Sequence, residues 1–214
     1  MIDSKRIGEL LAFTYPDARC ALRFSNPYEA LVAVSLSAQT TDASVNKVAP
    51  GFFKAYPSPK ELSAAPLEDI ESHIRSLGLY KNKAKNLCGL ARALMDKHGG
   101  EVPHDKKKLV ELPGVGIKTA NVVGAECFGI PAVAVDTHVK RVATRLGFAQ
   151  EGDEPEQIEK KIEKRYPLSL WIPVHHQLIA HGRSICHARS PECDRCPLSE
   201  VCRYFKKASI RQGR

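Results

Sequence analysis

Lys118 lies directly after the segment 112–116, Leu-Pro-Gly-Val-Gly, in the first turn of a helix that the sequence predicts over 117–128. Glycine permits positive φ and the close approach of another backbone, and free N–H groups at the start of a helix bind phosphate. The same dipoles favour the neutral, nucleophilic form of a nearby amine. Position alone leaves two interpretations of Lys118, a nucleophile and a phosphate-binding or solvated lysine.

Asp136 ends the apolar run 133–135, just before a helix predicted over 137–146. Asp is among the best N-cap residues, so a helix cap is the simplest interpretation. A carboxylate that backbone N–H groups hold ionised can also stabilise positive charge developing on a sugar. His138 would either line the same site or lie at the surface.

Four cysteines lie within 17 residues, with the spacing Cys186-x6-Cys193-x2-Cys196-x5-Cys202. In a reducing compartment, such a group indicates a metal site rather than disulfides. Structural zinc sites usually contain two close cysteine pairs, and only Cys193 and Cys196 form one here. The longer loops favour a larger group with four corners, a 4Fe–4S cluster, over zinc. Arg189, inside the first loop, would present positive charge to phosphates.

The composition fits a globular protein with a polyanionic partner. The chain has 214 residues, 43% hydrophobic and 26% charged, which allows one large domain or two lobes and argues against disorder. The net charge is +8, and +5 of it lies in residues 181–214, around the four cysteines. This charge fits nucleic acid. No apolar run matches a membrane span or a signal core, so we expect a cytoplasmic protein, nucleoid-associated if bacterial.

The elements that must position these residues read as helices. Apart from the two helices above, apolar periodicity and caps predict helices over 27–37, 41–56, 66–77, 81–98, 105–111, 155–165 and 170–184. Only 131–135 could be a strand, and a lone strand has no partner. The remaining cysteines, in apolar or helical context, are predicted to be small buried hydrophobic residues: Cys20, Cys88 and Cys127. The sequence therefore predicts an all-α fold.

Taken together, these segments resemble the endonuclease III family of DNA glycosylase/lyases over nearly the whole chain. Beside the hairpin, the Asp136 segment and the cysteine spacing, the likeness rests on Leu36-Ser37-Ala38-Gln39, Gly78-Leu79-Tyr80 with Lys83-Ala84, and Gly100-Glu101-Val102-Pro103. The resemblance implies two helical lobes with a cleft between them. A six-helix lobe at 21–131 would contain a helix–hairpin–helix element, and residues 1–20 with 132–214 would form the cluster lobe.

The resemblance also implies a bifunctional DNA glycosylase/AP lyase of base excision repair, a monomer with a 4Fe–4S cluster that acts on double-stranded DNA. Lys118 would attack the sugar C1′ of an oxidised pyrimidine or abasic nucleotide that has been flipped out, facing Asp136 across the cleft, and β-elimination would cut the strand. Gln39 and Leu79 would fill the gap left in the duplex, although Leu79 as a core residue remains an alternative. The other implied DNA contacts are Gly114, Val115, Gly116, Thr119, His138 and Arg189.

One departure and two competing functions remain. Ile117 stands where many family members have a basic residue, which predicts one phosphate contact fewer. The adenine-mismatch glycosylase branch shares the hairpin, the aspartate and the cluster, but it lacks the nucleophilic lysine and carries a long C-terminal domain. Only 12 residues follow Cys202 in this chain. A non-catalytic helix–hairpin–helix module with structural zinc is the second alternative, and the presence of both Lys118 and Asp136 argues against it.

Overall fold

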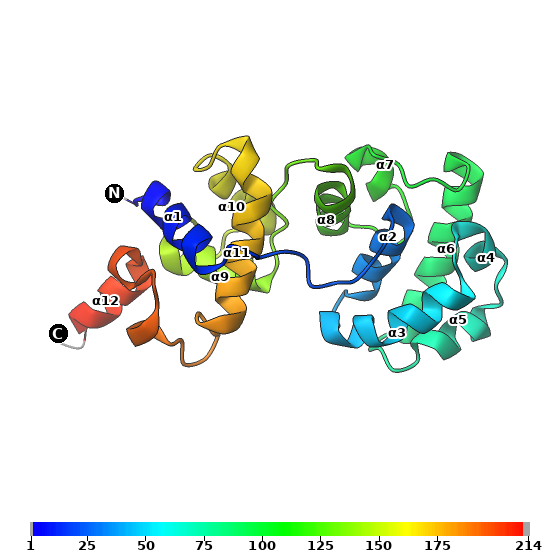
Figure 1. Cartoon of the computed structure of the whole chain (residues 1–214), viewed down its shortest axis with the longest axis horizontal. Coiled ribbons are helices and arrows are strands. Elements are labelled where there is room, and N and C mark those ends of the chain that lie inside the picture. Colours follow the sequence, from blue (N-terminus) through cyan, green and yellow to red (C-terminus); the bar gives the residue numbers. More distant parts are fainter. Residues whose placement is uncertain (1, 212–214) are drawn as a thin grey trace. The chain divides into compact units, whose positions relative to one another are not determined.

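The chain divides into two compact units, as the computed structural model shows for residues 2–211 (Figure 1). Residues 20–130 form the continuous unit, and residues 2–19 with 131–211 form the split unit. Residues 1 and 212–214 of the predicted cluster lobe lie outside the described residues. Every regular element within 2–211 is an α-helix or a short 3₁₀ turn, so the all-α prediction is confirmed. Residues 131–135 are irregular and do not form a strand.

The continuous unit is built around the long helix α6, which packs against α4 and α5, while α2 packs against α8 (Figure 1). Its core consists of apolar side chains, and Cys88 is buried among them as predicted, whereas Cys20 and Cys127 pack against the core only half-buried. Its helices are α2 (Pro27–Leu36), α3 (Asp42–Ala55), α4 (Pro59–Ala64), α5 (Leu67–Ile74), α6 (Tyr80–His98), α7 (Lys106–Val110) and α8 (Ile117–Phe128).

Helix α4 is one helix more than the six predicted for this part of the chain. Its start is locally encoded, because the Ser58 side chain accepts a hydrogen bond from the backbone N–H of Lys60 and Pro59 occupies the first turn. Proline suits that position, since its missing N–H would have no partner inside the helix. The helix is only 6 residues long, too short for apolar periodicity to reveal it.

The split unit combines an N-terminal helix with the C-terminal part of the chain. Helix α11 packs against both α9 and α1, and the core includes Ile7, Leu11, Phe148 and Leu178. Helices α1 and α12 were not predicted; α1 buries only Ile7 and Leu11, so tertiary packing rather than a long apolar pattern holds it. The helices are α1 (Ser4–Thr14), α9 (Thr137–Leu146), α10 (Pro155–Glu163), α11 (Trp171–Ser184) and α12 (Arg203–Arg211).

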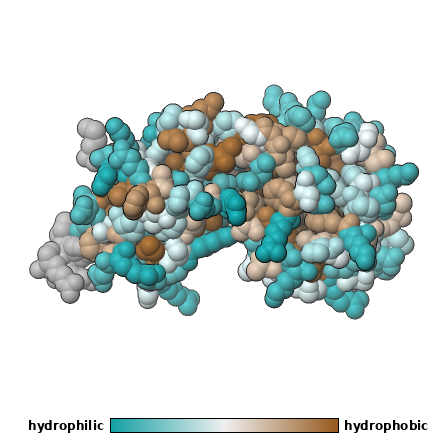
Figure 2. Space-filling model, viewed as in Figure 1, coloured by the Kyte–Doolittle hydropathy of each residue, from teal (hydrophilic) through white to brown (hydrophobic). Residues whose placement is uncertain are grey.

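Hydrophobic residues reach the surface as separate patches among hydrophilic ones (Figure 2). Phe13 is 88% exposed, and Leu79 and Leu168 are each 57% exposed. No helix within the described residues is long and apolar enough to cross a membrane.

Candidate functional site

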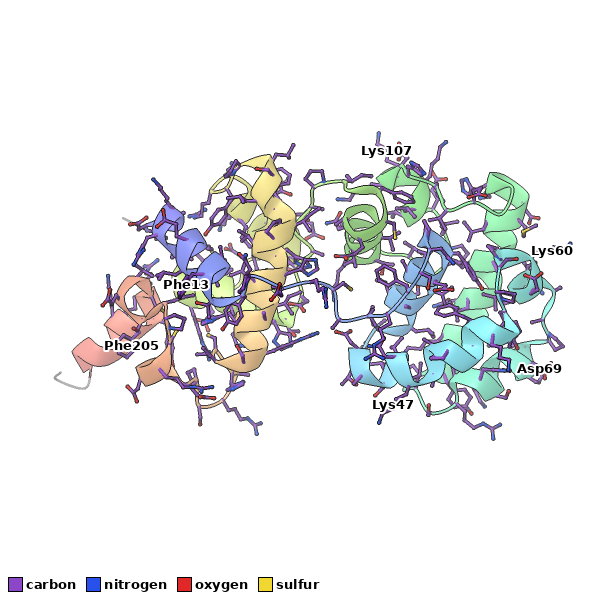
Figure 3. All side chains as sticks on the ribbon, in the orientation of Figure 1. Phe13, Lys47, Lys60, Asp69, Lys107 and Phe205 are labelled. Atoms are coloured by element: carbon purple, nitrogen blue, oxygen red, sulfur yellow. The ribbon has the colours of Figure 1, made fainter. Side chains whose placement is uncertain are left out.

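Helices α7 and α8 pack against each other and form a hairpin whose turn requires a glycine at position 114. Gly114 has φ +77°, and a Cβ atom there would lie 2.9 Å from the Cβ atom of Asn86. Both the backbone conformation and the close approach therefore exclude a larger residue. Lys107 on α7 is exposed and points away from the ribbon (Figure 3).

The start of α8 leaves backbone N–H groups without a side-chain partner. Gly116 is the N-cap and provides no capping hydrogen bond. Lys118 is exposed in the first turn and forms no hydrogen bond or ion pair with the described residues of its unit, while Thr119 is half-buried. Val115 is only 5% exposed, so a DNA contact of Val115 would have to come from its backbone. Free N–H groups beside an exposed ammonium form a local site for an anion such as phosphate.

Asp136 is the N-cap of α9, as its position in the sequence indicated. Its Oδ1 atom accepts a hydrogen bond of 2.8 Å from the backbone N–H of Val139. The other carboxylate oxygen has no hydrogen-bond partner among the described residues of the split unit. His138 is half-buried, and its Nδ1 atom lies 3.1 Å from Nη2 of Arg141, so its ring is held against its own helix.

Gln39 and Leu79, far apart in the sequence, line one cavity together with Pro113 and Gly114. Both residues have left-handed backbone, with φ 53° at Gln39 and φ 59° at Leu79. Leu79 is 57% exposed and is therefore not a core residue. The continuous unit thus brings three of the predicted DNA-binding residues together. Ile117, on the neighbouring helix α8, is 43% exposed.

The four cysteines Cys186, Cys193, Cys196 and Cys202 form no disulfide, and all four line a single cavity. Within residues 2–211, no group of three or more His, Cys, Asp or Glu side chains is arranged to hold a single ion. The thiols therefore surround a space instead of meeting at one point, which fits a group with four corners. Burial raises the pKa of Cys196 to about 11, and burial together with the neighbouring thiols raises the pKa of Cys193 and Cys202.

Two arginines on α9 hold the loop that carries the first of these cysteines, and sequence reasoning missed them. Arg145 donates from Nη1 to Cys186 Sγ at 3.2 Å and to the His187 carbonyl at 2.7 Å. Arg141 donates from Nε to the Cys186 carbonyl at 2.9 Å. Their spacing of four residues on one helix face was the available signal. Arg189, predicted to face DNA from this loop, is exposed.

His181 joins the N-terminal helix region to the cysteine cavity. Its Nδ1 atom lies 2.9 Å from the Tyr15 hydroxyl, and its Nε2 atom lies 3.6 Å from Cys196 Sγ. Burial lowers the pKa of His181 to about 4, so the ring is neutral near neutral pH. A neutral ring can donate one hydrogen bond, and the tautomer decides which neighbour receives it.

Comparison with known proteins identifies the family of the chain. Residues 32–168 match the HhH-GPD superfamily of base excision DNA repair proteins, and residues 186–202 match the iron–sulfur binding domain of endonuclease III. Endonuclease III of Bacillus subtilis is 48% identical over 94% of this chain and 90% of its own length. Endonuclease III of Escherichia coli K12 is 44% identical over 91% of this chain and 92% of its own.

A solved structure gives the same result. The structure of a trapped endonuclease III–DNA covalent intermediate, an estranged-adenine complex, is 49% identical, with a TM-score of 0.93 over 97% of this chain and 99% of that one. The chain belongs to the endonuclease III family. It is a bifunctional DNA glycosylase/AP lyase of base excision repair that binds DNA, and its C-terminal cysteine segment is an iron–sulfur domain rather than a zinc site.

Proposed function

We propose that Lys118 is the nucleophile of this enzyme and that its substrates are oxidised or ring-saturated pyrimidines and abasic sites in double-stranded DNA. The observation that carries the proposal is the exposed Lys118 amine without a partner in its unit, in the same helical turn as the free N–H groups at the start of α8. Those N–H groups would bind the phosphate next to the damaged nucleotide and bring the sugar to the amine.

The proposed reaction has two bond-breaking stages. The lone pair of Lys118 Nζ forms a bond to C1′, and the bond from C1′ to the base breaks, so that the base leaves with the electron pair and is protonated. Loss of the amine proton and opening of the sugar ring yield a Schiff base. A general base then removes the C2′ proton, the electron pair forms a C2′–C3′ double bond conjugated with the Schiff base, and the C3′–O bond breaks, so that the 3′ part of the strand leaves with a 5′-phosphate end. Water then hydrolyses the Schiff base and releases Lys118.

Asp136 would act on the same sugar through its charge. Its Oδ1 atom is already bonded to the Val139 N–H, which fixes the direction of the carboxylate. The other oxygen remains available to accept a proton from the Lys118 amine or to stabilise positive charge on the sugar. The Asp136 carboxylate need not move when positive charge develops on the sugar, because its hydrogen bond to the helix already holds it in place.

The four cysteine thiolates would hold the cluster, since all four are free and line one cavity. When bound, a 4Fe–4S cluster would link the four cysteine positions through iron–sulfur bonds. Two arginines near the cysteines would then act on charge. Arg145 offsets negative charge at Cys186 through its hydrogen bond to Sγ, and the exposed Arg189 faces DNA phosphate.

The remaining DNA contacts would come from both units. Gln39 and Leu79 fill the gap that the flipped nucleotide leaves, and the backbone of residues 114–116 with Thr119 binds the adjacent phosphates. His138 contributes a further contact. We propose that the enzyme acts as a monomer in the cytoplasm, close to the chromosome.

Borohydride trapping tests the nucleophile, the intermediate and the substrate class together. Borohydride reduces a Schiff base to a stable amine, so wild-type protein is expected to form a covalent adduct with duplexes that contain thymine glycol or an abasic site. Lys118→Ala should form none, whereas Lys97→Ala, which removes an exposed lysine at the far end of α6, should form normal amounts. If wild-type protein forms no adduct with either duplex, the proposed mechanism is wrong.

A further inference from the structure

Lys83 is a buried cation without a carboxylate partner. Its side chain is only 7% exposed, and it forms no ion pair with any described residue. Burying an unpaired charge is unfavourable, and burial accordingly lowers the pKa of Lys83. An unpaired buried charge beside a cavity is a common mark of a functional site. Lys83 lines the same cavity as Gln39 and Leu79.

Lys83 forms two hydrogen bonds with residues at or next to the lining of that cavity. Its own N–H donates to the carbonyl of Leu79 at 3.0 Å. Its Nζ donates to the hydroxyl of Thr40, the residue after Gln39. The Thr40 hydroxyl in turn donates to the carbonyl of Ala38 at 3.4 Å, so this chain of hydrogen bonds reaches the residues before and after Gln39.

Gln39 and Leu79 need such support because their backbone conformation is unfavourable. Apart from Ser190, they are the only non-glycine residues with positive φ among the described residues. Residues other than glycine rarely adopt left-handed backbone conformation, and they keep it only when the surrounding structure holds them there. The N-terminus of α6, where Leu79 is the N-cap, has no side-chain capping bond of its own.

We propose that Lys83 is a positioning residue whose side chain holds Gln39 in the conformation in which it fills the gap in the duplex beside Leu79. This inference rests on the proposed gap-filling role of those two residues. The Lys83 side chain acts through the Thr40 hydroxyl, whereas the bond from its backbone N–H to Leu79 is a helix hydrogen bond that does not depend on the side chain. Substitution of its side chain therefore affects Gln39 first.

The test measures binding of the full-length, cluster-containing protein to a duplex with a non-cleavable abasic analogue opposite 2-aminopurine, whose fluorescence rises when it is unstacked. Lys83→Met is expected to weaken binding to this duplex and to reduce the fluorescence rise, with binding to undamaged duplex unchanged. The loss should be about tenfold or more, the usual weight of a hydrogen bond to a charged group. Thr40→Val should have the same effect, and the double variant should be no weaker than either single variant.

Two control variants separate this role from general loss of charge or structure. Thr40→Ser keeps the hydroxyl and should bind like wild type. Lys97→Met removes an exposed positive charge from the other end of α6 and should also bind like wild type. If Lys83→Met does not fold, as judged by circular dichroism, the Thr40→Val and Thr40→Ser pair decides the question.

Several outcomes would overturn the inference. The inference is wrong if Lys83→Met or Thr40→Val binds the abasic-analogue duplex as tightly as wild type does and gives the same rise in 2-aminopurine fluorescence. If the slope of log K against log salt concentration is smaller in magnitude by about 0.9 for Lys83→Met, Lys83 contacts a phosphate directly instead. If Gln39→Ala and Leu79→Ala leave the fluorescence rise unchanged, the gap-filling role itself is wrong. If those two variants lose it and Lys83→Met keeps it, only the role of Lys83 is wrong.

Discussion

Helices α8 and α9 belong to different units and begin in opposite electrostatic states. Helix α8 starts at Gly116, which has no capping side chain, so its first N–H groups remain free for an anion. Helix α9 starts at Asp136, whose carboxylate already accepts the Val139 N–H. The same local element therefore serves two purposes, since a free helix start attracts phosphate and a capped one displays a fixed negative charge.

The two units also differ in what completes their structure. In the continuous unit, apolar side chains fill the core, and Leu31, Phe52 and Leu94 are fully buried. In the split unit, part of the interior is the cavity lined by the four cysteines, and Arg141 and Arg145 hold the loop at one side of it. The first unit is complete with its own side chains, whereas the second is built around space for a bound group.

Loss of a cluster ligand should have the largest effect, and it should be confined to the split unit. Structural metal sites contribute about 10 kcal/mol or more to small domains that depend on them. Cys202→Ala is expected to remove amide protection from residues 131–211 and to leave residues 20–130 protected, as measured by hydrogen–deuterium exchange. Cys20→Ala, at a half-buried cysteine of the continuous unit, is the matched control. Equal loss of protection in both units would contradict the comparison.

Asp136→Asn separates the cap from the chemistry. Asn is about as good an N-cap as Asp, so the variant should fold and melt like wild type. Turnover should fall by about 10²- to 10⁴-fold, the usual contribution of a positioned acid–base group. Single-turnover base release and thermal denaturation measure the two effects. Near-normal turnover would leave Asp136 with a structural role only.

Gly116→Asp would convert the start of α8 into a copy of the start of α9. Gly116 has extended backbone, φ −91° and ψ 175°, and nothing lies within 4 Å of a Cβ atom there, so the substitution fits. The new cap should stabilise the protein by about 0.5 kcal/mol. DNA affinity should fall by about tenfold or more, with a smaller salt dependence as phosphate contacts are lost.

Gly116→Asn is the control for that substitution, because it adds a cap without a charge. It should keep most of the DNA affinity that Gly116→Asp loses. If fluorescence anisotropy shows equal losses for both variants, the free N–H groups rather than the absence of negative charge determine phosphate binding.

The smallest expected effect concerns acid stability of the continuous unit. The Ser58 hydroxyl donates to Glu61 and lowers the pKa of that carboxyl below its ordinary 4.5. A carboxylate with a lowered pKa in the folded state stabilises the protein above its unfolded pKa, and this contribution disappears as pH falls through the folded value. The difference in melting temperature between wild type and Glu61→Gln should therefore shrink from about pH 6 to about pH 3. In a Ser58→Ala background, Glu61→Gln should change the melting temperature by the same amount at every pH. If the difference between wild type and Glu61→Gln also stays constant with pH, the prediction is wrong.

Sequence patterns predicted the helices best where both ends carry local signals. Helix α8 and helix α9 have the predicted bounds, because Gly116 and Asp136 mark their starts and Gly129 and Gly147 end them in left-handed conformation. Helix α1 was missed because only two of its side chains are buried. Helix α4 was missed although its Ser58 and Pro59 start signal is present in the sequence.

The candidate site divides in the same way. Lys118, Asp136 and the cysteine spacing were readable because each belongs to a short continuous segment. The partners of these residues were not readable. Arg145 reaches Cys186 across 41 residues of sequence, and Lys83 reaches Thr40 across 43. Contacts over such separations depend on how whole helices pack, which apolar periodicity does not specify.

The sequence by itself determined the all-α class, the hairpin, the two helix starts and the four thiols, because caps, glycines and ligand spacing act over a few neighbouring residues. Only the tertiary structure decided that Leu79 is exposed, that it shares a cavity with Gln39, and that a buried lysine lies beside both. Leucine is apolar in either setting, and whether it is buried depends on what the rest of the chain places against it.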